Sequence, residues 1–139
     1  MGYTNYWQQP TDFNDKQWSL ITKEFEYIID IAGDKIQDTE CDDKVIMFNG
    51  GKGGSCETFY LEKNKDRKPQ YEGQDTNFNF CKTRGMEYDI YVWHMLTFCQ
   101  MVKEDFKPTK DGWAITDEFV GGNESKETNI NNIREVTNV

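Results

Sequence analysis

Residues 86–106, MEYDIYVWHMLTFCQMVKEDF, decide the fold of this chain. From Tyr91 to Val102, apolar side chains fall on nearly every side of a helix, and Pro108 ends the helical pattern. A helix that is apolar all round is buried, because a surface helix needs a polar face toward water. The segment therefore predicts a central helix that the rest of the chain covers.

A second helix is predicted over residues 15–32. Asn14 stands before it with Gln17 three residues later, which is the pattern of a capping box, and Gly33 ends it. Its apolar residues recur at helical spacing: Trp18, Ile21, Phe25, Ile28, Ile29 and Ala32. This spacing puts one apolar stripe on an otherwise polar helix.

The other apolar segments alternate as strands do. They are residues 2–8, 44–50, 55–63, 78–83 and 112–120. The glycines of GGKGG predict a hairpin turn between the second and third, whereas the acid-rich segment 34–43 and the polar segment 63–77 are predicted as loops. We expect an α+β fold: an antiparallel sheet of about four or five strands with two helices on one face.

A chain of 139 residues with 14% aromatic residues is long enough to bury one core. We expect a single domain over residues 1–120 and a polar tail over 121–139. The tail carries Ile130, Ile133 and Val136 at helical spacing without a core of its own. It is either mobile or used in assembly, and a homo-oligomer is one possible outcome.

The four cysteines are widely spaced, and His94 is the single histidine. A zinc site needs about four convergent ligands, usually in close pairs, and a disulfide scaffold needs a secretory route. The start of the chain lacks a signal-peptide pattern, and no apolar run reaches the ~20 residues of a membrane span. We therefore expect reduced thiols, no metal, and a cytoplasmic protein.

The formal net charge is −9. Sequence-independent binding of nucleic acid relies on basic side chains that contact the phosphates, so we do not expect it of this chain. Residues 1–45 carry ten acids against four lysines, a balance of −6. Such an acidic surface either keeps the protein soluble or meets a basic partner.

Two segments have features of anion sites. The run FNGGKGGSC, residues 48–56, places Lys52 among glycine amides, but it joins two predicted strands, whereas a phosphate loop leads into a helix. Lys82, Thr83 and Arg84 stand just before a predicted helix start, where free N–H groups favour anions. The alternative for this second segment is that its basic residues pair with Glu87 and Asp89.

Catalytic and metal sets are not evident in the sequence. His94 lies in the apolar helix, where a satisfied core histidine is the simpler interpretation. The acids at Asp38, Glu40, Asp42 and Asp43 alternate as in calcium loops but lack the central glycine and the terminal bidentate glutamate. No cofactor is expected.

Four blocks of the sequence are GYTNYW (2–7), FNGGKGGSCETF (48–59), FNFCKTRGMEYDIYV (78–92) and KDGW (110–113). In this order they resemble small, mostly uncharacterised phage and prophage proteins, which open with GYTHYW and continue with NGxGxxSHETF, FCKTxxxPYD and SDGxW. This chain has Asn5 and Cys56 where that family has histidines, and Glu87 where it has proline. The resemblance implies a viral setting and no particular activity.

The residues predicted to contact a ligand combine these blocks with the two candidate anion segments. Asn and Glu read hydrogen-bonding edges, Lys and Thr take phosphate, and Tyr6 or Trp7 stacks on a base. The set is Asn5, Tyr6, Trp7, Asn49, Lys52, Glu57, Thr58, Lys82, Thr83, Arg84, Asp89 and Asp111.

Three functions follow as hypotheses. The first is a phage-type protein that sequesters a small anionic, nucleotide-like ligand, such as an immune signal of the host. The second is an inhibitor whose acidic residues 30–43 occupy a basic groove of a host nuclease, as anti-CRISPR or anti-restriction factors do. The third is a small nucleotide hydrolase with Glu57 or Asp89 as general base and Lys82 on the phosphate.

Overall fold

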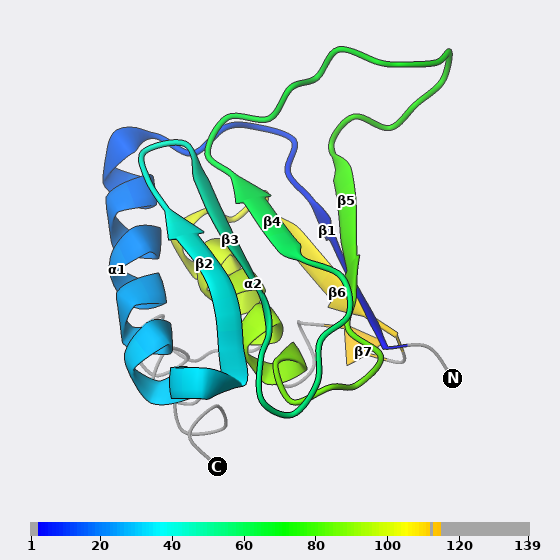
Figure 1. Cartoon of the computed structure of the whole chain (residues 1–139). Coiled ribbons are helices and arrows are strands. Elements are labelled where there is room, and N and C mark those ends of the chain that lie inside the picture. Colours follow the sequence, from blue (N-terminus) through cyan, green and yellow to red (C-terminus); the bar gives the residue numbers. More distant parts are fainter. Residues whose placement is uncertain (1–2, 112, 115–139) are drawn as a thin grey trace.

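The computed structural model describes residues 3–111 and 113–114. Two helices, α1 (Asp15–Ala32) and α2 (Asp89–Val102), combine with a short 3-10 turn and seven strands in the order shown in Figure 1. The turn is η1 (Gly33–Lys35), and the strands are β1 (Thr4–Gln8), β2 (Ile36–Cys41), β3 (Val45–Gly50), β4 (Phe59–Glu62), β5 (Phe78–Lys82), β6 (Lys107–Lys110) and β7 (Trp113–Ala114). The predicted α+β class is confirmed.

The strands form two antiparallel sheets instead of the single sheet of four or five strands that we expected. One has the order β5-β1-β6-β7 and the other the order β2-β3-β4. They adjoin just before β4, where the Glu57 N–H donates to the Lys82 carbonyl at 3.0 Å. The Glu57 carboxylate in turn accepts the Lys82 N–H at 2.7 Å. Because a ladder needs a series of such bonds, this local junction leaves the sheets separate.

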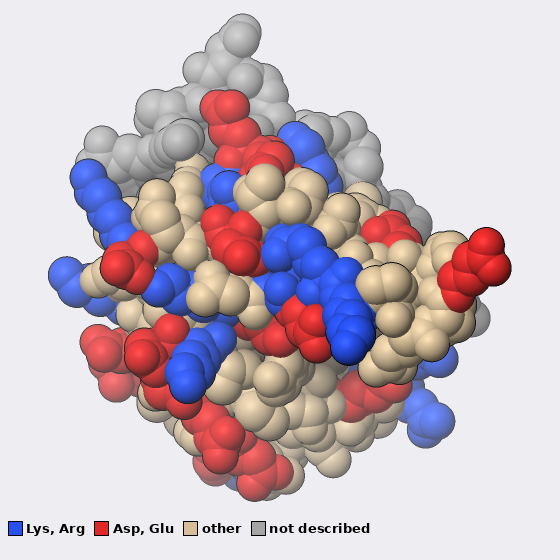
Figure 2. Space-filling view, turned by 90° about the horizontal axis from the view of Figure 1, so that it is seen from above, with Lys and Arg blue, Asp and Glu red and all other residues tan. Residues whose placement is uncertain are grey.

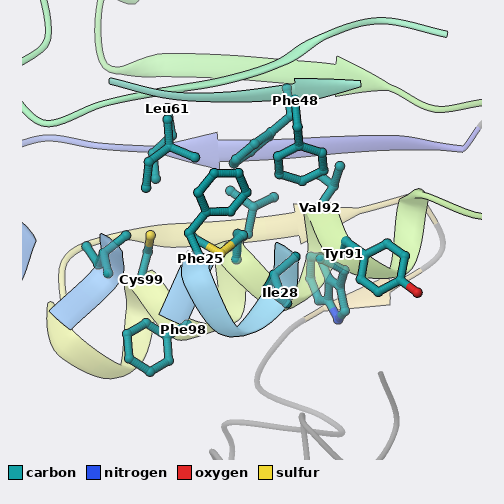
Figure 3. Packing of buried hydrophobic residues seen from close by; sticks show 14 of the residues in the cluster. Phe25, Ile28, Phe48, Leu61, Tyr91, Val92, Phe98 and Cys99 are labelled. Atoms are coloured by element: carbon teal, nitrogen blue, oxygen red, sulfur yellow. The ribbon is translucent and has the colours of Figure 1, made fainter. Parts of the chain in front are cut away.

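Both helices lie on one side of the strands, as the sequence predicted (Figure 1). The close-up in Figure 3 shows Phe48 of β3 and Leu61 of β4 pointing from the strands toward Phe25 and Ile28 of α1. Phe25 and Phe48 stack with ring centres 5.5 Å apart. Neither α1 nor α2 therefore covers the opposite, outer face of the strands.

The helices form for the reasons that the sequence indicated. The capping box of α1 is present: Asn14 Oδ1 accepts the Gln17 N–H at 2.8 Å, and Gln17 Oε1 accepts the Asn14 N–H at 2.9 Å. In α2 every residue from Tyr91 to Met101 is buried, which confirms the central helix. His94 is a satisfied core histidine, because its Nε2 lies 2.6 Å from Oε2 of the buried Glu24.

Two strands arise where we predicted none. The acid-rich segment 34–43 contains β2, an edge strand with a bulge between Gln37 and Glu40. β6 contains Pro108, which pairs with Trp7 of β1. Proline and acids are depleted in strands, so both segments depend on tertiary pairing instead of local preference.

Part of the remaining predictions falls outside the described residues. The predicted last strand is present as β7 for two residues, and the rest of 112–120 and the tail lie beyond the described range. Among the described residues, no helix is long and apolar enough to span a lipid bilayer.

Candidate functional site

The predicted ligand-contacting residues lie in several places instead of one pocket. Asn5, Thr83 and Asp89 meet beneath β1. Asn49 lies at the end of β3, and Lys52, Glu57 and Thr58 belong to the connection between β3 and β4. Trp7 is 1% exposed and packs on Phe59 in the core. Tyr6, Lys82 and Asp111 remain on the outer side of the sheet, and the exposed Arg84 follows it in the 83–88 turn.

Asp89 is the centre of the cluster beneath β1. Its Oδ1 accepts from Asn5 Nδ2 at 2.9 Å and from the Thr83 hydroxyl. Its Oδ2 accepts from Lys110 Nζ at 2.6 Å. Both Asn5 and Thr83 are fully buried. These bonds anchor the first turn of α2 to β1 and β6, so the Asp89 carboxylate is occupied by the fold.

The connection between β3 and β4 is built by Asn49. Its Oδ1 accepts the N–H groups of Gly50 at 2.7 Å and Cys56 at 3.2 Å, and its Nδ2 donates to the Cys56 carbonyl at 3.1 Å and to Thr58 Oγ1 at 3.2 Å. A side chain at Gly50 would place its Cβ 1.9 Å from the Gly54 carbonyl oxygen, so this turn requires glycine for packing. Lys52 is exposed in the turn, and its backbone N–H donates to the Asp34 carbonyl at 2.8 Å.

Lys82, Thr83 and Arg84 do not converge at the start of α2. Lys82 is exposed, Thr83 is buried, and Arg84 is exposed with a left-handed backbone, φ 55°. The alternative pairing with Glu87 and Asp89 is not formed either. Within residues 3–111 and 113–114, neither Lys82 nor Arg84 has an ion pair, and Asp89 pairs with Lys110. The helix start is therefore not a ready-made phosphate site.

Three aromatic rings form a row on the outer face of the first sheet, and we call Tyr6, which is half-buried, and the exposed Phe78 and Phe80 the aromatic strip. Tyr6 stacks on Phe78 with ring centres 5.9 Å apart, and Phe78 meets Phe80 at 6.1 Å. Phe78 is 38% and Phe80 45% exposed. Large apolar side chains that face water together mark binding surfaces more often than isolated ones do.

A lysine lies at one end of the aromatic strip. Lys82 Nζ is 5.9 Å from the centre of the Phe80 ring, and Lys82 is exposed. At the same end, the Tyr6 hydroxyl donates to Asp111 Oδ1 at 2.9 Å, and this hydrogen bond raises the pKa of Tyr6 above its usual value. The phenol therefore stays neutral near pH 7 and is held in place. A flat neutral surface next to a cation suits a ligand with an aromatic base and an anionic group.

The residues predicted from the sequence to contact a ligand include Tyr6 and Lys82 but not Phe78 and Phe80. Alternation in FNFCK puts both phenylalanines on one face and Cys81 on the other. This alternation does not indicate which face is buried, because both faces carry apolar residues: Phe78 and Phe80 on one, and Cys81 on the other. The burial of Cys81 in the core decides it.

A cleft of about 360 Å³ opens beside the start of α2, with Lys35, Met86, Glu87 and Tyr91 in its walls. The described residues that line this cleft include both a lysine, Lys35, and two acids, Glu87 and Asp89, so its charge does not favour ligands of one sign. No group of three or more His, Cys, Asp or Glu side chains within the described ranges is arranged to hold a metal ion. Burial raises the pKa of Cys81 to about 12, so this thiol is protonated at neutral pH and a poor nucleophile.

The end of the molecule that carries the 63–77 segment shows basic and acidic side chains next to each other (Figure 2). Ion pairs join Lys63 to Asp15 and Arg67 to Asp12 there. Because these cations already have carboxylate partners, this end lacks the continuous positive field that grips a nucleic-acid backbone.

Comparisons with protein families, with curated proteins and with solved structures find no match to this chain. The resemblance to phage proteins therefore remains an expectation from the four sequence blocks, and function has to be argued from the site.

Proposed function

We propose that this protein binds a small nucleotide-type ligand on the aromatic strip and does not transform it. The observation that carries the proposal is the row of rings on the outer face of the first sheet with Lys82 at its end. A base stacks on the rings, and a phosphate group meets the lysine. Stacking of a base on an aromatic side chain contributes about 1–3 kcal/mol, and any base can supply it.

Binding without reaction is favoured by what the carboxylates do. Glu57 accepts the backbone N–H of Lys82, and Asp89 accepts three side-chain donors. A general base has to reach the proton that it removes, whereas both oxygens of Asp89 and one oxygen of Glu57 already accept hydrogen bonds within the fold. In the viral setting that the sequence blocks imply, such a protein sequesters a nucleotide signal of the host's defence.

The test is a thermal melt of the full chain with a panel of linear and cyclic nucleotides. A ligand at a hundredfold excess over Kd stabilises the folded state by about 2.7 kcal/mol and raises the melting temperature. We expect Phe80→Ala to weaken the binding of an active nucleotide roughly 5- to 150-fold, which is the loss of one stacking ring. When the complex is denatured, mass spectrometry should show that the released ligand is chemically unchanged.

Tyr60→Ala is the matched control, because Tyr60 is 42% exposed on the outer face of the other sheet. It should bind as the unaltered chain does. The proposal fails if no nucleotide shifts the melt, or if Phe80→Ala and Tyr60→Ala bind equally well.

A second candidate is the acidic inhibitor, which is favoured by the placement of Asp38 and Glu40 on the exposed edge strand β2. Together with Asp43 in the following turn, they form no ion pair in the part of the chain that the structure describes. Asp43 also borders a cleft of about 430 Å³ whose other walls include Asp15 and Glu26. Unpaired carboxylates on an edge can face the basic channel of a nuclease.

The variant Asp38→Asn/Glu40→Gln/Asp43→Asn tests this second candidate. Asp42 is left intact, because its Oδ1 accepts the N–H groups of Lys44 and Val45 and shapes the turn. An inhibitor of this kind should lose its protection of phage against host nucleases, while nucleotide binding is unchanged. Full protection by the triple variant would exclude the mechanism.

A further inference from the structure

Strand register extends the aromatic strip to a second cation. In the antiparallel pairs, Phe80 lies opposite Tyr6, and Phe78 lies opposite Gln8. On its other side, Gln8 lies opposite Lys107 of β6. Directly paired residues share a face of the sheet, so the exposed Lys107 stands on the outer face at the Phe78 end. Lys82 and Lys107 therefore flank the rings from opposite ends.

The Phe78 end carries one further lysine. Lys65 Nζ donates to the Phe78 carbonyl at 3.2 Å, which fixes this ammonium group beside the same end of the strip. The ring of Phe78 contacts both of the others: its centre lies 5.9 Å from the centre of the Tyr6 ring and 6.1 Å from that of the Phe80 ring. The rings thus continue without a gap between the two cationic ends.

The dimensions exceed those of a single nucleotide. Lys82 and Phe78 are four residues apart along β5, which corresponds to about 13 Å. Lys107 lies in the same cross-strand row as Phe78, so this is also the separation of the two cationic ends along the strands. One base covers one or two of the three rings, and one phosphate reaches one end. Two bases with phosphates on both sides would cover the rings and meet both cationic ends.

Each end of the strip also carries an acidic side chain. At the Lys82 end, Asp111 accepts the Thr4 N–H at 3.0 Å as well as the Tyr6 hydroxyl. At the Phe78 end, Asp75 accepts from Gln8 Nε2 at 2.9 Å, and this hydrogen bond lowers the pKa of Asp75. Fixed negative charge repels a strand that runs on past the strip, and the chain as a whole carries −9.

We infer that the ligand of the aromatic strip is an oligonucleotide of two or three nucleotides, linear or cyclic, in which two bases stack between phosphates held by Lys82 and Lys107. The inference rests on the proposed function and narrows it to a ligand class. It excludes both a mononucleotide and a long single strand as the preferred ligand.

The experiment is titration calorimetry of the full chain with adenosine monophosphate, linear adenylate oligomers of two, three and six nucleotides, and cyclic di-adenylate. We expect affinity to rise at least tenfold from one to two or three nucleotides. From three to six nucleotides, the affinity should change by no more than about threefold, because the additional phosphates meet Asp75 or Asp111. The linear and cyclic ligands show which form of the dinucleotide is preferred.

Lys107→Gln separates the two ends of the strip. It should weaken the trinucleotide at least fivefold but the mononucleotide no more than twofold, because a single phosphate still reaches Lys82. Lys23→Gln removes the same charge from an exposed position on α1 and should change neither affinity. Both lysines are exposed, so both variants should melt as the unaltered chain does.

Equal affinity for mononucleotide and trinucleotide would overturn the inference and leave the proposed function standing. The inference would also be overturned if affinity kept rising with length to six nucleotides. It would be overturned as well if Lys107→Gln weakened mononucleotide and trinucleotide binding to the same extent. If no member of the series binds, the proposed function falls together with the inference.

Discussion

At the scale of the residue, Asp38 stores backbone strain in the bulge of β2. Its φ is 56°, in the left-handed region that costs a side chain about 1 kcal/mol or more. We expect Asp38→Gly to raise the free energy of unfolding by about 0.5–1 kcal/mol, measured by urea denaturation, because glycine adopts this φ freely.

Asp43→Gly is the control for Asp38→Gly. It removes the same charge at an exposed position of the same acidic segment, where φ is not positive. It should lower the free energy of unfolding by roughly 0.5–1 kcal/mol, since glycine there only adds freedom to the unfolded chain. Equal effects of the two substitutions would show that charge, and not backbone conformation, decides stability at Asp38.

At the scale of the element, the β3–β4 connection depends on the four hydrogen bonds of Asn49. Asn49→Ala leaves the Cys56 N–H and carbonyl without their partners, so we expect a loss of about 1–3 kcal/mol in the free energy of unfolding. Asn49→Asp keeps the two acceptor bonds but cannot donate to Cys56 or Thr58, and should lie between Asn49→Ala and the unaltered chain. Thermal unfolding measures both.

Asn64→Ala serves as the reference for these variants, because Asn64 is exposed in the 63–77 segment. It should change stability by less than about 0.5 kcal/mol. If Asn49→Ala is as mild as Asn64→Ala, the connection is held by its glycines and not by the asparagine. Nucleotide binding should survive in Asn49→Ala, because the aromatic strip is on the other sheet.

At the scale of the whole molecule, two sheets side by side cover two helices and leave one broad outer face. The central helix fills the space beneath both sheets, so each sheet is half-covered, as antiparallel sheets commonly are. On the first sheet that open face carries the aromatic strip, and the edge of the second carries acids that form no ion pair among the described residues. The charge of −9 is therefore compatible with a local cationic site for a short anion.

The sequence by itself determined the helices and the character of the core. An all-apolar helix and a capped amphipathic helix follow from 3.6-residue periodicity and from Asn14 with Gln17, which are local signals. The burial of His94 also followed from its apolar neighbours. These features need no knowledge of distant parts of the chain.

Only the tertiary structure decided the strands β2 and β6, the separation into two sheets, and the roles of the polar residues. Strand pairing joins residues far apart in sequence, so Pro108 is in a strand because Trp7 lies opposite. Likewise, Asp89 and Glu57 resemble catalytic acids in sequence, but distant donors occupy them. The rings of Phe78 and Phe80 face water because Cys81, on the other face of β5, is buried in the core, and alternation alone cannot tell which face of a strand is buried.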